Sequence, residues 1–135
     1  MKHSSKKLKA YTLNELLIVL VIIGILILLA LPNLMPLIGK AKSIEAQQQL
    51  NHLYTLERSH FMLHSKFSAD FVDIGFEHPK TIEEGGDANY SIEIIELEAS
   101  KFKARATALQ DFDGDGIYNV WEIDQDKKLI ELTKD

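Results

Sequence analysis

The residues with the most specific chemistry form an acidic, glycine-containing segment, DFDGDGIYNVWE, over residues 111–122. Its spacing fits the calcium loop of about twelve residues, in which oxygens stand at positions 1, 3, 5, 7, 9 and 12 and glycine at position 6. Calcium prefers about six to eight hard oxygens, and clustered carboxylates repel one another without a cation. The spacing therefore predicts a calcium site whose ligands are Asp111, Asp113, Asp115, the Ile117 carbonyl, Asn119 and Glu122.

The flanks of this segment have strand character, so the surroundings are not those of a helix–loop–helix calcium site. If the chain is extended after Asn119, Glu122 would point away from the loop, and Asp124 or Asp126 could replace it. The alternative is an acidic turn between two strands that binds no metal.

Two histidines, His60 and His64, stand one helical turn apart and could share a metal ion. The sequence offers them no third ligand, so a solvated helical face is the favoured interpretation. There is no glycine loop for phosphate, and no Ser or Cys nucleophile with a base near it. We therefore expect a protein that is not an enzyme.

An uncharged apolar segment precedes all of these residues. Residues 16–39 carry no charge, and a helix of this length would cover roughly 36 Å, enough to cross a hydrocarbon layer of about 30 Å. Glu15 stands at the start of this segment, where a carboxylate costs several kcal/mol unless it is paired or protonated. The sequence predicts a membrane helix with one acid near its N-terminal end.

The residues before this helix differ from an ordinary secretory signal, which would have a shorter apolar region followed by a cleavage site. Lys2, Lys6, Lys7 and Lys9 precede the helix without any acid, and the small-residue junction Ala10–Tyr11 lies before the apolar run. Cleavage there would leave the helix on the mature protein.

Taken together, Ala10, Tyr11-Thr12-Leu13, Glu15, Gly24 and Pro32 resemble the class III signal of type IV pilins and of the pseudopilins of type II secretion. Ala10 and Tyr11 depart from the usual Gly and Phe but keep a small residue followed by an aromatic one. The resemblance covers about the first 45 residues.

This resemblance implies a prepilin peptidase that cuts between Ala10 and Tyr11 and methylates the new Tyr11 amine. In a staggered stack of helices, Glu15 of one subunit could meet that amine on its neighbour, which would favour one register. The alternative is an acid at the membrane edge whose carboxylate reaches water.

Pro32, Pro36 and Gly39 follow within eight residues, so we expect the helix to kink or loosen there. A helix that ends there is the alternative. The resemblance implies a segment that can unwind as subunits pack.

The sequence predicts a leader over residues 1–10, a transmembrane or filament-core helix over 11–39 and a globular head over 40–135. Residues 40–66 have a wide apolar face of helical period. One side would pack on the head and, if the chain forms filaments, the other on neighbouring subunits; an ordinary core stripe is the alternative. Runs at 89–97, 101–108, 117–123 and 129–132 have strand character, and residues 65–86 form a loop with a short helical turn. We expect an α+β fold with an antiparallel sheet of about four strands, which is also the pilin fold that the resemblance implies.

The charge argues against a nucleic-acid backbone as the main partner. The net charge is −5, and removal of four leader lysines leaves 11 basic residues against 20 acids, or −9. There is no cysteine and hence no disulfide. The lysines before the helix place the leader in the cytoplasm and the head outside; for the resembled family this means a single pass through the bacterial inner membrane and a periplasmic head.

The resemblance, closest to a major pseudopilin, implies a structural subunit of a type II secretion pseudopilus, a helical fibre that drives protein export. It also implies that the C-terminal loop binds calcium. The partners that it implies are further copies of the chain, minor pseudopilins, prepilin peptidase and the inner-membrane assembly platform. One alternative is a type IV pilus subunit for motility, adhesion or DNA uptake. A rival of another class is a membrane-anchored calcium-binding module that does not polymerise.

Overall fold

The computed structural model describes residues 10–135, so the lysine block and all of the predicted leader except Ala10 lie outside the described residues. The chain divides into two compact units, the first ending at Leu34 and the second spanning Met35–Asp135. Helix α1 (Leu13–His64) contributes its first part to one unit and its second part to the other.

In the first unit, α1 is apolar around its whole circumference. Its most apolar stretch has a mean hydropathy of 3.0, and none of that stretch is buried within the chain. By length and composition the helix can cross a membrane, which confirms the prediction of a long apolar N-terminal helix.

The helix does not end at the two prolines. Pro32 and Pro36 both have helical backbone, and α1 continues to His64. Each proline removes one backbone donor, but the bonds of the residues around it maintain the helix. The alternative of a helix ending here is therefore wrong, and unwinding during assembly stays a prediction.

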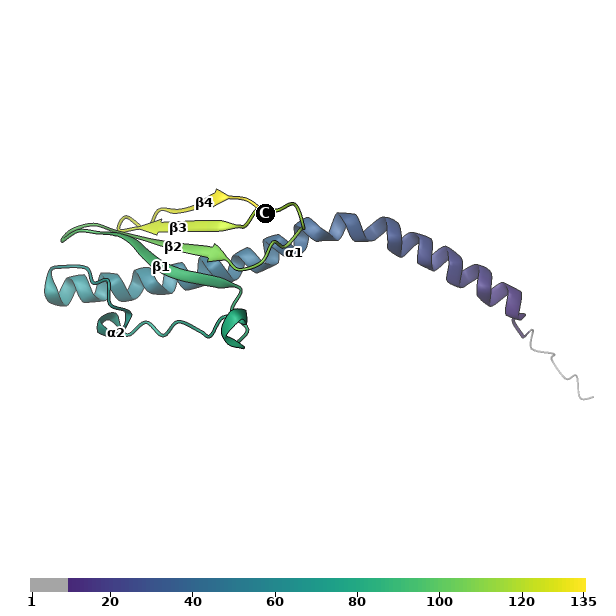
Figure 1. The fold of residues 1–135 in the computed structure, drawn as a ribbon, viewed down its shortest axis with the longest axis horizontal. Helices are drawn as coiled ribbons and strands as arrows, with labels where there is room; N and C mark the ends of the chain where they lie inside the picture. Colours follow the sequence, from purple (N-terminus) through teal and green to yellow (C-terminus); the bar gives the residue numbers. More distant parts are fainter. Residues whose placement is uncertain (1–9) are drawn as a thin grey trace, which may run out of the picture. The chain divides into compact units, whose positions relative to one another are not determined.

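The second unit is built on a four-stranded antiparallel sheet in the order β1-β2-β3-β4, which lies along the second part of α1 (Figure 1). The strands are β1 (Tyr90–Leu97), β2 (Phe102–Ala108), β3 (Val120–Asp124) and β4 (Leu129–Thr133). The α+β fold with four antiparallel strands is confirmed. Strand β3 starts three residues later than predicted, because the acidic segment before it forms a loop.

The core lies between α1 and one face of the sheet. Alternate residues of β2, namely Phe102, Ala104, Ala106 and Ala108, are at most 4% exposed. The alanines leave room for the larger side chains Leu50 and Leu53 of α1, which are fully buried. The predicted apolar face of this helix is thereby confirmed: Ala46 is fully buried too, and Tyr54 and Phe61 pack against the core.

The segment between α1 and β1 covers one edge of the sheet. It contains α2 (Phe71–Ile74) and a 3-10 turn, η1 (Ile82–Glu84), and Phe67 and Phe76 anchor it in the core. His78 Nε2 accepts a hydrogen bond of 2.9 Å from the Ile92 N–H of β1. This contact protects an edge strand from pairing with another chain.

The turn after η1 allows a test of the packing of this segment. A side chain at Gly86 would overlap the backbone carbonyl and Cβ of Lys80, whereas a side chain at Gly85 would meet open space. We expect Gly86→Ala to lower the free energy of unfolding by about 1–3 kcal/mol through overpacking. Gly85→Ala, whose φ is +81°, should cost about 1 kcal/mol through backbone strain alone. Denaturant unfolding of both variants checks this order, and equal losses would contradict it.

Candidate functional site

The acidic loop between β2 and β3 curls around the side chain of its first aspartate. Asp111 accepts hydrogen bonds of 2.6 Å from the N–H groups of both Gly114 and Gly116. The two glycines have φ of +84° and +86°, a conformation that other residues rarely adopt. The glycine at the sixth position thus makes the sharp turn that the calcium-loop pattern requires.

The next two aspartates repeat the same local turn. Asp113 accepts a hydrogen bond from the Asp115 N–H at 3.0 Å, and Asp115 accepts one from the Ile117 N–H at 2.7 Å. Such turns hold each carboxylate over the loop backbone. Ile117, whose carbonyl is the ligand predicted at the seventh position, is 44% exposed.

A fourth carboxylate, which the sequence pattern did not indicate, joins this loop. Asp135 accepts hydrogen bonds from the N–H groups of Phe112 at 2.8 Å and Asp113 at 3.1 Å. One carboxylate oxygen from each of Asp111, Asp113, Asp115 and Asp135 lies within 4.8 Å of the others. Because Asp135 follows the last strand, no local spacing could have revealed it. We call these four residues the Asp cluster.

The carboxylates of the Asp cluster differ in the direction of their pKa shifts. Hydrogen bonds, first of all that from the Gly116 N–H, hold the pKa of Asp111 below its ordinary value. A hydrogen bond from the Asp115 N–H also lowers the pKa of Asp113. Desolvation and the charges of Asp115, Asp135 and Asp111 outweigh that bond, so the pKa of Asp113 is raised. The loop backbone therefore only partly compensates the mutual repulsion.

Asn119, the predicted ninth-position ligand, is engaged elsewhere. Its side-chain oxygen accepts a hydrogen bond of 2.7 Å from the Tyr90 hydroxyl, and its amide donates to Glu131 and to the Thr133 carbonyl. Burial raises the pKa of Tyr90, so the hydroxyl keeps its proton and donates. From its position just before β3, the Asn119 side chain thus links the two edge strands β1 and β4.

The structure does not bring Glu122, Asp124 or Asp126 into the Asp cluster. Glu122 lies in β3 and accepts from Arg105 Nη2 at 2.6 Å across the sheet. The extended backbone turns it away from the loop, as the strand pattern had suggested. Asp124 instead closes the β3–β4 turn by accepting from the N–H groups of Asp126 and Lys128.

The Asp cluster also lies close to α1 through the backbone of Asp135. A Cβ at Gly39 would lie 3.1 Å from the Asp135 carbonyl oxygen and 3.7 Å from the Phe112 Cβ. In this structure Gly39 therefore allows a close approach of the chain rather than a break in the helix.

At the other end of α1, Glu15 takes part in a reciprocal cap. The Thr12 N–H donates to Glu15 Oε2 at 3.1 Å, and the Glu15 N–H donates to the Thr12 hydroxyl at 3.3 Å. This is a capping box, which satisfies two donors that a helix start leaves unpaired. Ala10 and Tyr11 precede it and are exposed. The capping residue Thr12 could have been found from the Thr-Leu-Asn-Glu spacing.

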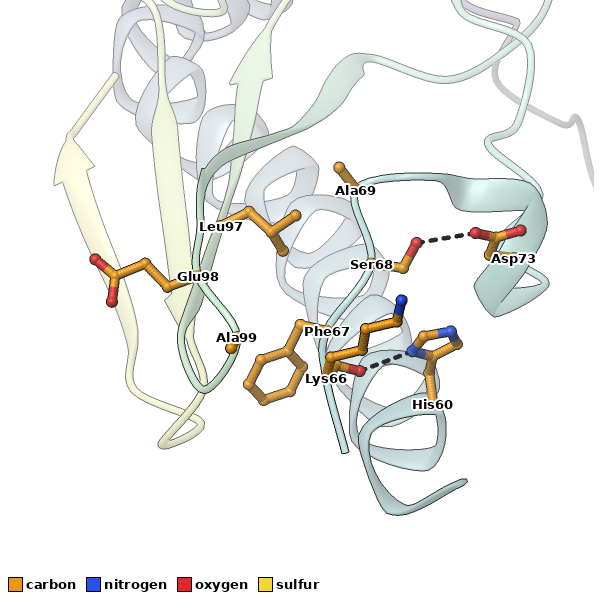
Figure 2. Close-up of a pocket in the computed structure, with 9 residues that line it drawn as sticks. All are labelled: His60, Lys66, Phe67, Ser68, Ala69, Asp73, Leu97, Glu98 and Ala99. Carbon is orange, nitrogen blue, oxygen red and sulfur yellow. Dashed lines mark hydrogen bonds between the residues drawn. The ribbon is translucent and has the colours of Figure 1, made fainter. Parts of the chain in front are cut away.

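His60 and His64 lie on the exposed end of α1, with ring centroids 4.4 Å apart. His60 Nδ1 lies 2.9 Å from the Lys66 carbonyl oxygen, a contact that Figure 2 shows at the rim of a pocket of about 430 Å³. Within the described residues, the two histidines are not part of any group of three or more metal-binding side chains.

Comparison with known proteins supports the resemblance to pilins. No protein-family model matches the chain. The chain is 40% identical over 68 residues to the type IV major pilin protein PilA of Myxococcus xanthus (strain DK1622). The match covers 50% of this chain and 31% of that pilin, so the chain spans about a third of the length of the curated relative. This homology, with the long N-terminal apolar helix, confirms the resemblance to the type IV pilin-like family.

Proposed function

We propose that the protein is a pilin-like structural subunit, held in a membrane by the first part of α1 before it assembles with further copies into a helical filament. The observation that carries this proposal is the exposed apolar surface of that helix. From Leu16 to Leu31 its large apolar side chains are 46–69% exposed in the isolated chain. A helix that is apolar all round requires lipid or other protein around it. The named role of the homologous pilin supports this proposal.

Glu15 gives the assembly a register in this proposal. One carboxylate oxygen bonds the Thr12 N–H, and no described residue pairs with the charge through a salt bridge. Cleavage between Ala10 and Tyr11 by a prepilin peptidase would create an amine one turn away. Thr12 would keep its amide N–H after that cut, so the capping box is compatible with processing. A neighbour's amine, methylated or not, would then neutralise the buried carboxylate.

Within this class we favour a type II secretion pseudopilus, with minor pseudopilins and an inner-membrane platform as partners. The small head, the acidic loop and the lack of cysteine support this choice. A type IV pilus subunit is the alternative, and the similarity to a major pilin does not separate the two. Deletion of the gene separates them: loss of protein export supports the pseudopilus, and loss of a surface pilus with export intact supports the alternative.

We further propose that the Asp cluster holds calcium. Four carboxylates with oxygens within 4.8 Å of one another form a hard-oxygen donor set, and the raised pKa of Asp113 reflects charges that a cation would neutralise. In this proposal Asp135 takes the place that the sequence pattern gave to Glu122. The ion would order the loop for a contact with another subunit.

The assembly proposal predicts different results for two changes at one cap. Glu15→Gln keeps an oxygen that can accept the Thr12 N–H but removes the charge, so we expect filament formation to fall at least tenfold while the monomer remains in the membrane. Thr12→Val removes only the hydroxyl and should cost about 1 kcal/mol of helix stability, with assembly largely retained. Membrane fractionation and electron microscopy of filaments measure both. A Glu15→Gln protein that assembles normally would favour the anchored module that does not polymerise.

The N-terminus of the mature protein tests the proposed cleavage between Ala10 and Tyr11. Mass spectrometry of the mature protein should find an N-terminus at Tyr11. A chain that starts at Met1, or after a cut beyond Leu31, would rule out the cleavage proposal, and methylation would add one methyl group to the Tyr11 amine.

The calcium proposal predicts a thermal shift. Calcium at about a hundredfold excess over its dissociation constant should stabilise the protein by about 2.7 kcal/mol, and a chelator should reverse this. Asp113→Asn and Asp135→Asn should abolish the response. Asp126→Asn, with the same charge change outside the Asp cluster, should keep it.

Glu122→Gln distinguishes the two ligand sets. If it removes the calcium response and Asp135→Asn does not, the twelve-residue pattern is right and the Asp cluster is not the site. If chelation changes neither thermal stability nor assembly, the role of the ion is wrong.

A further inference from the structure

The stripe of α1 that faces the sheet ends in a charged residue. Its buried positions recur every three or four residues, as expected for a helix that packs on one side. These positions are Gly39, Ser43, Ala46, Leu50, Leu53 and Glu57. Glu57 is 0% exposed, although its place in the stripe suits an apolar side chain. A buried carboxylate costs several kcal/mol unless its charge is compensated.

Aromatic residues flank this position along α1. One turn before and one turn after Glu57, Tyr54 and Phe61 point to the same cluster. Ring centroids lie 6.3 Å apart for Tyr54 and Phe102, 4.7 Å for Phe61 and Phe67, and 4.8 Å for Phe67 and Phe102. The face of β2 towards the helix adds only alanines to Phe102, so this strand brings no charge to the carboxyl group.

Glu57 makes one hydrogen bond. Its Oε2 accepts from the Ser68 N–H at 3.1 Å, and its Oε1 has no partner among the described residues. Desolvation raises the pKa of Glu57, while the Ser68 N–H and the nearby His60 lower it; the net shift is upward. Burial therefore outweighs the hydrogen bond, and the neutral carboxyl group is favoured in the folded state.

The segment that bonds Glu57 has few other polar attachments. The Ser65 N–H donates to the Phe61 carbonyl of α1 at 2.7 Å. The Lys66 carbonyl contacts His60, and the Ser68 hydroxyl donates to Asp73 at 3.3 Å (Figure 2). The ionisable groups around it are His60 on α1, Lys66 in the segment, Asp73 on α2 and Glu98 in the β1–β2 turn, all of which line the open pocket. None of them makes a salt bridge to Glu57.

We propose that Glu57 is a protonation-controlled latch, which holds residues 68–70, next to the Phe67 anchor, against the head while its carboxyl group is neutral and releases them when it is charged. The charged group gains hydration only if the segment that covers it moves away. Because Ser68 lies in the wall of the pocket, release opens the buried carboxylate to water from that side.

The direction of the pH dependence follows from the raised pKa. The folded state binds a proton more tightly than the unfolded chain does, so the contribution of Glu57 to stability is fully present below the ordinary value of 4.5. It is lost as the pH rises through the raised pKa. The segment should therefore loosen with increasing pH.

Amide hydrogen exchange on the full chain in detergent micelles tests the latch. After correction for intrinsic exchange rates, we expect protection of the Ser68 N–H to fall at least tenfold between pH 4 and pH 8. Glu57→Gln keeps an acceptor without a titratable charge, and its profile should be flat. The amide of Ile123 in β3 should stay protected throughout, which separates release of the segment from global unfolding.

Glu84→Gln is the matched control, because Glu84 also accepts a backbone N–H, from Thr81, but is exposed. It should leave the Ser68 profile unchanged. A flat wild-type profile, or a Glu57→Gln profile that still falls, overturns the latch. If Glu57→Gln fails to fold, Glu57→Met provides the same test, since its Ser68 protection should be low at every pH, and a fall with pH would again overturn the proposal.

Discussion

The exposed apolar surface of the first part of α1 is the constraint on which the rest of the structure depends. Full burial of one large aliphatic side chain is worth about 1.5–3 kcal/mol, and the helix exposes such side chains on every side from Leu16 to Leu31. An isolated chain cannot satisfy them in water, whatever the head does. The functional classes that suit this helix are therefore those in which lipid or other protein surrounds it.

The second part of the same helix has a narrower apolar stripe than the first part and packs on one side only. It buries one face against the sheet. The inner strand β2 contributes three alanines to this contact, so the helix can approach closely. The close approach continues at Gly39, where the Asp135 backbone lies near the helix. Through Asp135 the acidic loop is tied to α1, and order in that loop would extend to the base of the head.

The sequence predicted most of what depends on local pattern. The apolar helix, the alternating strands and the turn glycine at position 116 all follow from periodicity and backbone preference. What it did not predict depends on contacts between distant residues. Asp135 reaches the acidic loop from the end of the chain, Asn119 is drawn into the sheet by Tyr90, and Glu122 pairs with Arg105 across two strands. A twelve-residue spacing carries no information on such contacts.

Two acids of α1, Glu15 and Glu57, stand where the surrounding pattern suits an apolar residue, and each receives only partial compensation inside the chain. Glu15 is bonded by the Thr12 N–H, and Glu57 by the Ser68 N–H, and among residues 10–135 no cation makes a salt bridge to either one. One hydrogen bond is worth about 1 kcal/mol, less than the cost of burying a carboxylate. Such violations of local pattern are expected where a residue serves something other than stability. For Glu15 the compensating charge can come from another chain. Glu57 is enclosed by its own head, where His60 offsets its charge only in part, so in the proposed latch a proton or hydration after release completes the compensation.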